Sequence, residues 1–498
     1  MTASPTAYAE LERRYARLSH VGGARAVLSW DHQTMMPEGG AAARAEQIAA
    51  LEVIEHELAT DAALGELQER AAAEPLDDWR RANLREMRRR WRHATALDAR
   101  LVEHLSRAAS AAEQVWREAR PAGDFARFAP HLDAVLALVR EAAARKAQAF
   151  GVTPYDALLD EYEPGCTAAR IDALFADLEA FLPDLLGRVL AHQKARPAPL
   201  RPEGPFDIAR QRALGARLMA AVGFDFRHGR LDASLHPFCG GTPDDVRITT
   251  RYDEADFTSA LMGVLHETGH AMYERGLPGA WRHQPVGEAR GTGLHESQSL
   301  LIEMQVCRGR EFLAFAAPIM RDTFGANGPA WQPENLYRLY TRVQPDFIRV
   351  EADEVTYPAH IILRYRLERA LIAGDLAVAD LPAAWHDGMR HLLGIVPPDH
   401  GRGCLQDIHW ADGLFGYFPT YTLGAIAAAQ LYAAARAAVP EFPHALARGD
   451  FQPLVSWLGA NVHGLGSFHT TDELMARATG QPLNAAAYKA HLEARYLG

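Results

Sequence analysis

The sequence is short of several features that define large classes of proteins. Only four cysteines occur among 498 residues, and none are in C-x-x-C spacing, so neither a disulfide framework nor a thiolate zinc site is expected. No run of 18 apolar residues is present, so no membrane-spanning helix is expected. The amino-terminal stretch has no apolar core of a signal peptide. We therefore expect a cytoplasmic protein that has no membrane partner.

Basic charge is also scarce. Acidic residues outnumber lysines and arginines by 63 to 52, which gives a formal net charge of −11. Lysine occurs only at positions 146, 194 and 489. This balance argues against nucleic acid as the main partner. Hydrophobic residues make up 48% of the chain and charged residues 23%, which is ordinary for a globular protein with a large core.

Helical periodicity is present along most of the chain. Alanine and leucine recur every three or four residues with arginine and glutamate between them. This pattern predicts helices over 5–20, 41–58, 62–73, 77–94, 98–119, 125–149, 168–193, 207–222, 294–315, 333–340, 356–373, 381–393, 421–438, 453–462 and 471–478. The proline-rich residues 195–205 are a predicted loop, and residues 394–418 show little periodicity.

We predict an all-α fold with one small β element, organised as a single domain over residues 1–498. A helical amino-terminal part covers about 1–195, and a second part covers about 206–498. The best strand candidate is Val246–Tyr252. A free strand edge there would align an extended peptide by backbone hydrogen bonds.

One stretch, Leu261–Gly276, combines a helical apolar stripe with a chemical motif. It contains His266-Glu-Thr-Gly-His270, and two imidazoles four residues apart lie on one helix face. That spacing lets both reach one Zn²⁺, while Glu267 beside them can polarise a water molecule. The alternative is an amphipathic helix with two histidines that bind nothing. We favour the metal because the helix is apolar on its histidine side, and buried imidazoles need polar partners.

A catalytic zinc has three protein ligands and one open position for water. The motif supplies two, and its longer form H-E-x-x-H-x-x-G-x-x-H is absent here. Position alone favours Glu296, near the start of the next predicted helix, without excluding its neighbours. The full set of downstream candidates is Glu274, His283, Glu288, His295, Glu296 and Glu303.

Six ordered motifs resemble those of one known family. They are His236-Pro-Phe238, Asp245-Val-Arg-Ile-Thr-Thr250, His266–His270, His295-Glu-Ser-Gln298, Ile348-Arg-Val-Glu-Ala-Asp353 and Gly403-Cys-Leu-Gln-Asp-Ile-His-Trp410. Trp30-Asp31, Thr34–Pro37 and Gly416-Tyr-Phe-Pro-Thr-Tyr421 extend the resemblance over almost the whole chain. By these motifs the sequence resembles the carboxypeptidase Taq family of metallocarboxypeptidases.

The resemblance implies several properties. The fold would be helical with a deep substrate groove, like that of neurolysin and angiotensin-converting enzyme, and the protein would be a homodimer. It would release C-terminal amino acids from peptides with broad specificity and act poorly on proline. His266, His270 and Glu296 would hold one Zn²⁺ per subunit, with Co²⁺ able to replace it, and Glu267 would be the catalytic base.

The reaction also needs a donor to the oxyanion of the tetrahedral intermediate. Tyr421 is our first candidate on resemblance to the wider group of such peptidases, with Tyr417 as the alternative and His409 near it. Either tyrosine could instead be an aromatic residue that lines a helix start. Asp407 is a candidate to orient His409 or another imidazole.

An exopeptidase must also hold the free carboxylate of its substrate. Arg349 is our candidate, since a guanidinium binds carboxylate through two parallel hydrogen bonds. Its alternative is an ion pair with Asp353, four residues on. Arg247 is the second candidate and could instead anchor the strand. His236 could bind substrate backbone or simply pack before Pro237.

These residues predict a zinc carboxypeptidase whose partners are peptides with a free C-terminus. One alternative is a zinc oligopeptidase that cleaves within peptides by the same chemistry. The other is a helical peptide-binding protein without activity, against which the complete set of predicted ligands and Glu267 argues.

Overall fold

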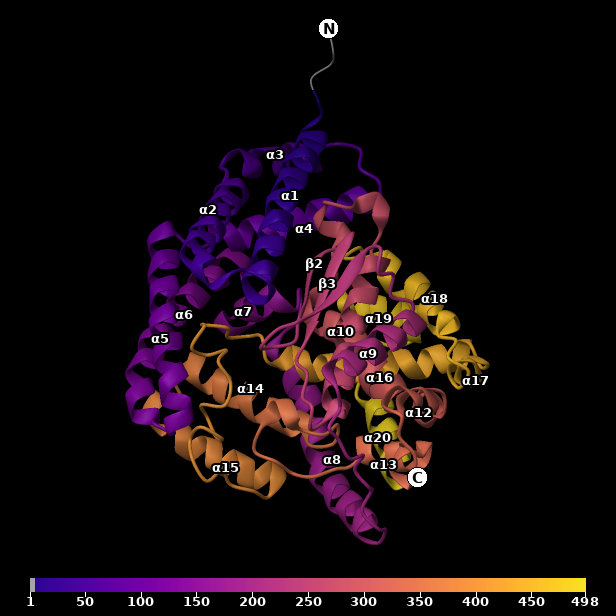
Figure 1. Ribbon diagram of the computed structural model, residues 1–498. Helices are drawn as coiled ribbons and strands as arrows, with labels where there is room; N and C mark the ends of the chain where they lie inside the picture. Colours follow the sequence, from indigo (N-terminus) through magenta and orange to yellow (C-terminus); the bar gives the residue numbers. More distant parts are fainter. Residues whose placement is uncertain (1–4) are drawn as a thin grey trace.

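The computed structural model describes residues 5–498 (Figure 1). The first four residues of the predicted domain lie outside the described residues. The first part of the chain is helical, and its helices are α1 (Ala7–Thr34), α2 (Ala41–Thr60), α3 (Ala63–Ala72), α4 (Asp78–Thr95), α5 (Ala99–Ala122), α6 (Phe125–Phe150), α7 (Pro154–Tyr162) and α8 (Ala168–Lys194). The predicted proline-rich loop follows α8.

Helices also build most of the second part. They are α9 (Ile208–Val222), α10 (Phe257–Gly276), α11 (Gly291–Leu300), α12 (Arg310–Phe324), α13 (Pro333–Tyr340), α14 (Tyr357–Ala373), α15 (Leu381–Leu393), α16 (Pro419–Ala438), α17 (Phe442–Leu446), α18 (Gln452–Asn461), α19 (Thr471–Thr479) and α20 (Ala486–Leu497). Two shorter segments matter for the site, the π-helix η4 (Leu301–Cys307) and the 3₁₀ turn η6 (Arg349–Glu351). The predicted helical class is confirmed.

The small β element is a three-stranded sheet beside α10 (Figure 1). Its strands are β1 (Gly229–Ala233), β2 (Cys239–Thr242) and β3 (Asp245–Thr250), in the order β1-β3-β2. β3 is parallel to β1 and antiparallel to β2. The predicted strand therefore exists, but the prediction that it offers a free edge is wrong. Both edges of β3 are paired, and only β1 and β2 can accept another strand.

Two helix predictions also need correction. The first helix does not end near residue 20 but runs through Gly22 and Gly23 to Thr34. A Cβ at Gly23 would lie 3.1 Å from the Thr242 side chain of β2, so this glycine lets α1 approach the sheet closely. The second is the range 294–315, where α11 passes into η4 and Gly309 then precedes α12.

The hydrophobic core determines where α10 lies. Its largest cluster contains residues from Ala112 to Tyr496, and therefore joins both parts of the chain. A second cluster holds α1, α3 and α4 together. A third, which includes Val246, Ile248 and Val264, fixes the sheet against α9 and α10. Helix α10 is thus held between the main core and the sheet.

Candidate metal centre

Three predicted ligands meet where α10 faces α11. A nitrogen of His266, a nitrogen of His270 and a carboxylate oxygen of Glu296 all lie within 4.8 Å of one another. Glu296 Oε2 is 3.4 Å from His270 Nε2 and 3.8 Å from His266 Nε2. Two imidazole nitrogens and one carboxylate oxygen form a donor set that catalytic zinc sites use. The donor chemistry therefore fits a divalent metal.

A second carboxylate orients His266 from behind. Glu303 Oε2, on the π-helix η4, is 2.9 Å from His266 Nδ1. If the Nδ1–H group donates to this carboxylate, the lone pair of Nε2 faces Glu296 and is free for a metal. Arg308 binds the other oxygen of Glu303 at 2.6 Å and so holds it in place. π-helical turns are rare and occur often at functional sites.

His270 is oriented by a relay of two residues. His295 Nδ1 lies 2.6 Å from His270 Nδ1, and His295 Nε2 lies 2.7 Å from Glu274 Oε1. A neutral His295 that donates its Nε2–H to Glu274 must accept the Nδ1–H of His270. This tautomer again leaves Nε2 of His270 directed toward Glu296. His295, Glu274 and Glu303 were candidate ligands on position alone, and the structure brings each of them to the outer side of a histidine.

Glycines let the helices around this cluster approach closely. A Cβ at Gly269 would lie 2.4 Å from the Gln298 carbonyl oxygen of α11. A Cβ at Gly424 on α16 would lie 2.8 Å from Glu296 Cγ. Both contacts are closer than a side chain allows. At the start of α10, the Asp256 side chain accepts a hydrogen bond from Thr258 N at 2.8 Å, which caps the helix.

Glu267 is buried next to the ligands, with 7% of its surface exposed. Burial raises its pKa to about 7, an effect that His266 opposes and Glu296 reinforces. A carboxyl with this pKa can exchange a proton near neutral pH. Glu296 shows the opposite behaviour. Burial alone would raise its pKa, but His266 and His270 lower it to about 2, so its carboxylate is ionised.

Aromatic residues gather around the start of α16, the helix that packs on Glu296 through Gly424. Tyr417 and Tyr421 lie with ring centroids 5.3 Å apart, and Tyr357 lies 6.4 Å from Tyr421. The hydroxyl of Tyr421 is 3.5 Å from His409 Nε2. Burial raises the pKa of all three tyrosines, and the Glu296 charge contributes to each shift. Their hydroxyls therefore stay protonated and able to donate.

Arg349 is buried and bound to the chain's own carboxylate. Its Nε and Nη2 atoms lie 3.1 and 2.9 Å from the two oxygens of Asp407. Arg364 contacts the same aspartate at 3.2 Å. The predicted alternative, a pair between Arg349 and Asp353, is wrong because Asp353 accepts backbone N–H groups instead. The suggestion that Asp407 orients His409 also needs correction, since Asp407 accepts hydrogen bonds from the two arginines instead.

The other two candidates lie on or beside the sheet. Arg247 is on the central strand, where it pairs with Asp245 at 2.7 Å and stacks on the ring of Trp30 at 4.3 Å. These contacts are those of a strand anchor. His236 lies in the exposed loop between β1 and β2. Among the described residues, neither belongs to the groups gathered around Glu296.

Sequence reasoning missed Tyr357 and Arg364 in this region. Tyr357 opens α14, and its ring lies against Tyr421. Arg364, about two turns further along α14, stacks on Phe418 at 4.0 Å and on Trp410 at 4.1 Å. The only signal was their place after the Ile348–Asp353 motif.

No helix among residues 5–498 is long and apolar enough to cross a membrane.

Known proteins share this architecture over the full length. The carboxypeptidase Taq (M32) metallopeptidase model matches residues 10–496. Thermostable carboxypeptidase 1 of Thermus thermophilus is 42% identical over 503 residues, covering 98% of this chain and 97% of that protein. The Pyrococcus furiosus protein of the same name is 36% identical, with 97% of each chain covered.

Solved structures agree with the sequence comparison. Trypanosoma cruzi metallocarboxypeptidase 1 superposes with a TM-score of 0.97 at 42% identity, with 99% of each chain covered. The M32 carboxypeptidase from Deinococcus radiodurans gives a TM-score of 0.93 at 39% identity, with 98% of each chain covered. The chain therefore belongs to the carboxypeptidase Taq (M32) family of metallopeptidases and is a peptide hydrolase of the metallocarboxypeptidase class.

Proposed function

We propose that this protein is a zinc-dependent carboxypeptidase that removes C-terminal amino acids from peptides with broad specificity. The observation that carries the proposal is the convergence of His266, His270 and Glu296, with Glu267 buried beside them. The family assignment supports the reaction class. In this proposal the three side chains hold one Zn²⁺, and Co²⁺ can replace it.

The metal and Glu267 divide the chemistry between them. A Zn²⁺ ion bound by the three ligands would supply Lewis acidity to the scissile carbonyl and to the attacking water. Glu267 accepts the proton from that water at its carboxylate and then donates it to the leaving amine. Its raised pKa suits both transfers, because the carboxyl must gain and lose a proton in each cycle.

Tyr421 is the proposed donor to the oxyanion, with Tyr417 as the alternative. Supporting this, burial raises the pKa of its hydroxyl, which is therefore protonated, and the Glu296 charge contributes to that shift. His409 lies 3.5 Å away and would orient the hydroxyl. Burial lowers the pKa of His409 to about 3, so the ring is neutral; a neutral ring with its proton on Nε2 would donate to the Tyr421 oxygen and leave the hydroxyl proton for the oxyanion.

Arg349 is the proposed binding group for the substrate carboxylate. Asp407 already engages its Nε and Nη2 atoms, so a substrate would be held through the Nη1 side rather than by the whole fork. Asp407 and Arg364 would keep the guanidinium in place. His236 and Arg247 remain candidate substrate contacts, although the Trp30 and Asp245 contacts of Arg247 favour its role as a strand anchor.

The deciding experiment compares two peptides that differ only at the C-terminus. The zinc-loaded protein should release an amino acid from the free acid, and an amidated copy should react at least tenfold more slowly. Equal rates would overturn the proposed requirement for a free C-terminus and favour an oligopeptidase. This outcome is worth testing because Asp407 already binds the Arg349 guanidinium that we propose for the substrate carboxylate. Activity that survives full removal of metal by a chelator would overturn the proposed chemistry.

We also propose a homodimer in the cytoplasm. The dimer rests on the family resemblance, and light scattering of the purified protein would test it. All four cysteines are free thiols, which supports a reducing compartment.

A further inference from the structure

Glu368 is a fully buried carboxyl group without an ion-pair partner. It lies on α14 with 0% of its surface exposed. Among residues 5–498, no lysine, arginine or histidine nitrogen lies within 4 Å of its oxygens, and the nearby Arg364 pairs with Asp407 at 3.2 Å instead. Burying such a group is costly unless polar partners satisfy it. The groups that bind Glu368 therefore indicate its role.

Three hydrogen-bond donors converge on this carboxylate. The Trp410 indole N–H donates to Oε2 at 2.9 Å, the Gly416 backbone N–H donates to Oε1, and the Tyr155 hydroxyl donates to Oε1 at 2.8 Å. Tyr155 keeps its proton, because burial raises its pKa well above the usual value. Burial also raises the pKa of Glu368, and the three hydrogen bonds oppose that shift because they favour the ionised form.

Two of these donors belong to one loop, and each is next to a residue proposed for the oxyanion site. Trp410 directly follows His409, and Gly416 directly precedes Tyr417. The rings of His409 and Tyr417 stack with centroids 5.6 Å apart, and the Tyr421 hydroxyl is 3.5 Å from His409 Nε2. Because one carboxylate binds both ends of the loop, it sets how far apart the histidine and the tyrosines lie.

The loop is also packed tightly against α7 at its second end. Gly416 has a φ of +89°, and a Cβ there would lie 2.8 Å from the backbone carbonyl carbon of Leu158. On the same helix, the ring of Tyr162 lies against that of Tyr417, with centroids 5.2 Å apart. The carboxylate on one side and α7 on the other thus determine where the loop ends and α16 begins.

We propose that Glu368 is a positioning residue for the oxyanion donor. Its carboxylate holds the loop of residues 410–416 in the arrangement that brings His409 to the Tyr421 hydroxyl, and it does so without touching the substrate. This inference rests on the proposed function, because it assigns Glu368 a part in the same reaction. A carboxylate that only stabilised the fold would affect the melting temperature and leave the kcat of the folded enzyme unchanged.

Glu368→Gln tests this role, because an amide cannot accept from all three donors. Whichever way the amide is turned, its NH₂ group faces the N–H of either Trp410 or Gly416, so one end of the loop is released. We expect kcat at saturating zinc to fall at least tenfold, with KM and zinc affinity within about twofold of the wild type. Asp172→Asn is the matched control, because this exposed carboxylate on α8 binds α14 through Tyr365 at 2.8 Å rather than binding the loop. The control should be fully active.

A double-mutant cycle with Tyr421→Phe shows whether the effect acts through the oxyanion donor. Tyr421→Phe alone should lower kcat by about 10²–10³-fold, the usual effect of losing one such donor. In that background, Glu368→Gln should lower kcat by less than about twofold, since both changes act on one interaction. Equal losses in the two backgrounds would overturn the proposal, as would a wild-type kcat in Glu368→Gln.

Two further variants keep the outcomes distinct. Trp410→Phe removes the indole N–H but keeps an aromatic ring; it should also lower kcat, and it decides the matter if Glu368→Gln does not fold. If Tyr421→Phe is fully active, Tyr417→Phe takes its place in the cycle, and full activity of both would overturn the proposal. A wild-type enzyme that releases no amino acid from a free-acid peptide would refute the proposed function itself, whereas an active wild type with an additive cycle refutes only the role of Glu368.

Discussion

Two buried glutamates in the metal centre have opposite protonation behaviour. Glu267 and Glu296 are both largely shielded from water, yet burial raises the pKa of Glu267 to about 7, whereas two imidazoles lower that of Glu296 to about 2. Environments that separate the pKa values of neighbouring carboxyls also separate their roles. Glu296 is suited to remain a charged ligand, and Glu267 to exchange protons.

Glu267→Gln should therefore abolish catalysis without removing the metal. We expect kcat to fall by about 10²–10⁴-fold, the usual contribution of a general base, while zinc content stays at the wild-type level. Amino-acid release from a small peptide and metal analysis check both parts. Glu203→Gln, an exposed glutamate in the proline-rich loop, is the control and should be fully active. Turnover near the wild-type rate in the Glu267 variant would contradict its role.

Glu303→Gln should lower the affinity for zinc rather than the rate of the chemical step. The amide removes the negative charge behind His266 but keeps the size of the side chain. We expect zinc to bind about 10–100-fold more weakly, as for other residues that support a ligand. Competition with a chromogenic chelator measures the affinity. At saturating zinc, kcat should approach the wild-type value, and a kcat loss as large as that of Glu267→Gln would contradict this positioning role.

At the level of elements, the sequence predicted helices well because their periodicity is strong. It failed where packing overrides local preference. Gly22 and Gly23 suggest a break, but α1 continues because Gly23 must approach β2. The sheet order could not be predicted, since pairing depends on contacts between distant segments. In the site, spacing alone predicted His266, Glu267 and His270 as neighbours. Spacing could not tell whether Glu296 or Glu303 is the third ligand, because both lie on the one helix predicted over residues 294–315.

The crossing of α10 and α11 depends on Gly269. Gly269→Ala would place a Cβ 2.4 Å from the Gln298 carbonyl, so the helices must separate. We expect a loss of about 1–3 kcal/mol in stability, typical of overpacking, together with weaker zinc binding. Gly263→Ala on the same helix is the control, because its Cβ would meet only the Thr250 side chain at 3.9 Å.

Differential scanning calorimetry and zinc titration of both variants test the prediction. The control should be as stable as the wild type or more so, since alanine favours a helix interior. If the two alanine variants melted at the same temperature, the close approach of the helices would not be the constraint that we infer.

At the level of the whole molecule, the last helix, α20, packs against the buried carboxylate of Glu354. Glu354 lies 2.8 Å from His491 and 3.1 Å from Arg495, both on α20, and accepts from the Tyr496 hydroxyl. The same arginine donates to the backbone of η4, which carries Glu303. The chain terminus is thereby joined to the π-helix behind the metal centre.

This network makes the stability of the folded protein depend on pH. Burial would raise the pKa of Glu354, but His491 and Arg495 lower it to about 2. The folded pKa is below the unfolded value of about 4.3. The stabilisation is therefore complete above that value and is lost as the pH falls toward 2. We expect Glu354→Gln to melt below the wild type at pH 7, and the gap should narrow between pH 5 and 3. A gap that stays constant would contradict the assignment.

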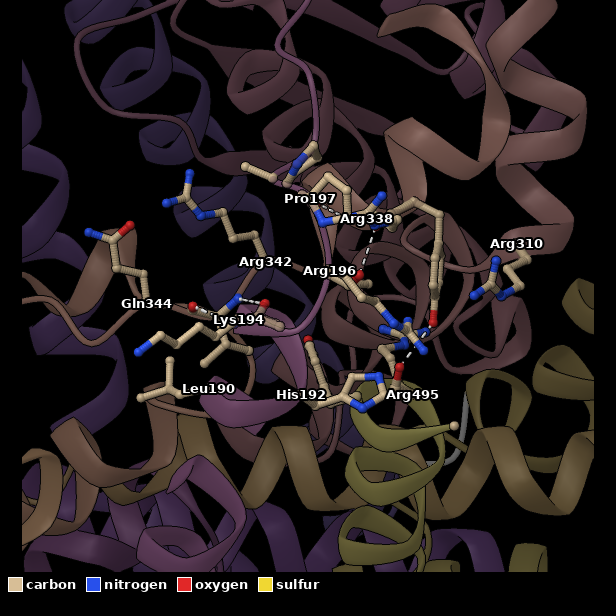
Figure 2. Close-up of a pocket in the computed structure, with 18 residues that line it drawn as sticks. Leu190, His192, Lys194, Arg196, Pro197, Arg310, Arg338, Arg342, Gln344 and Arg495 are labelled. Carbon is tan, nitrogen blue, oxygen red and sulfur yellow. Dashed lines mark hydrogen bonds between the residues drawn. The ribbon is translucent and has the colours of Figure 1, made fainter. Parts of the chain in front are cut away.

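The segment between α13 and α14 connects the end of α8 to Arg349. It begins beside the end of α8 (Figure 2), where the Gln193 side chain accepts a hydrogen bond from Val343 N at 2.8 Å and donates one to the Val343 carbonyl at 2.9 Å. It continues to Arg349 on η6. The position of Arg349 is therefore set from two directions, by its ion pair with Asp407 and by a backbone segment that is anchored on α8.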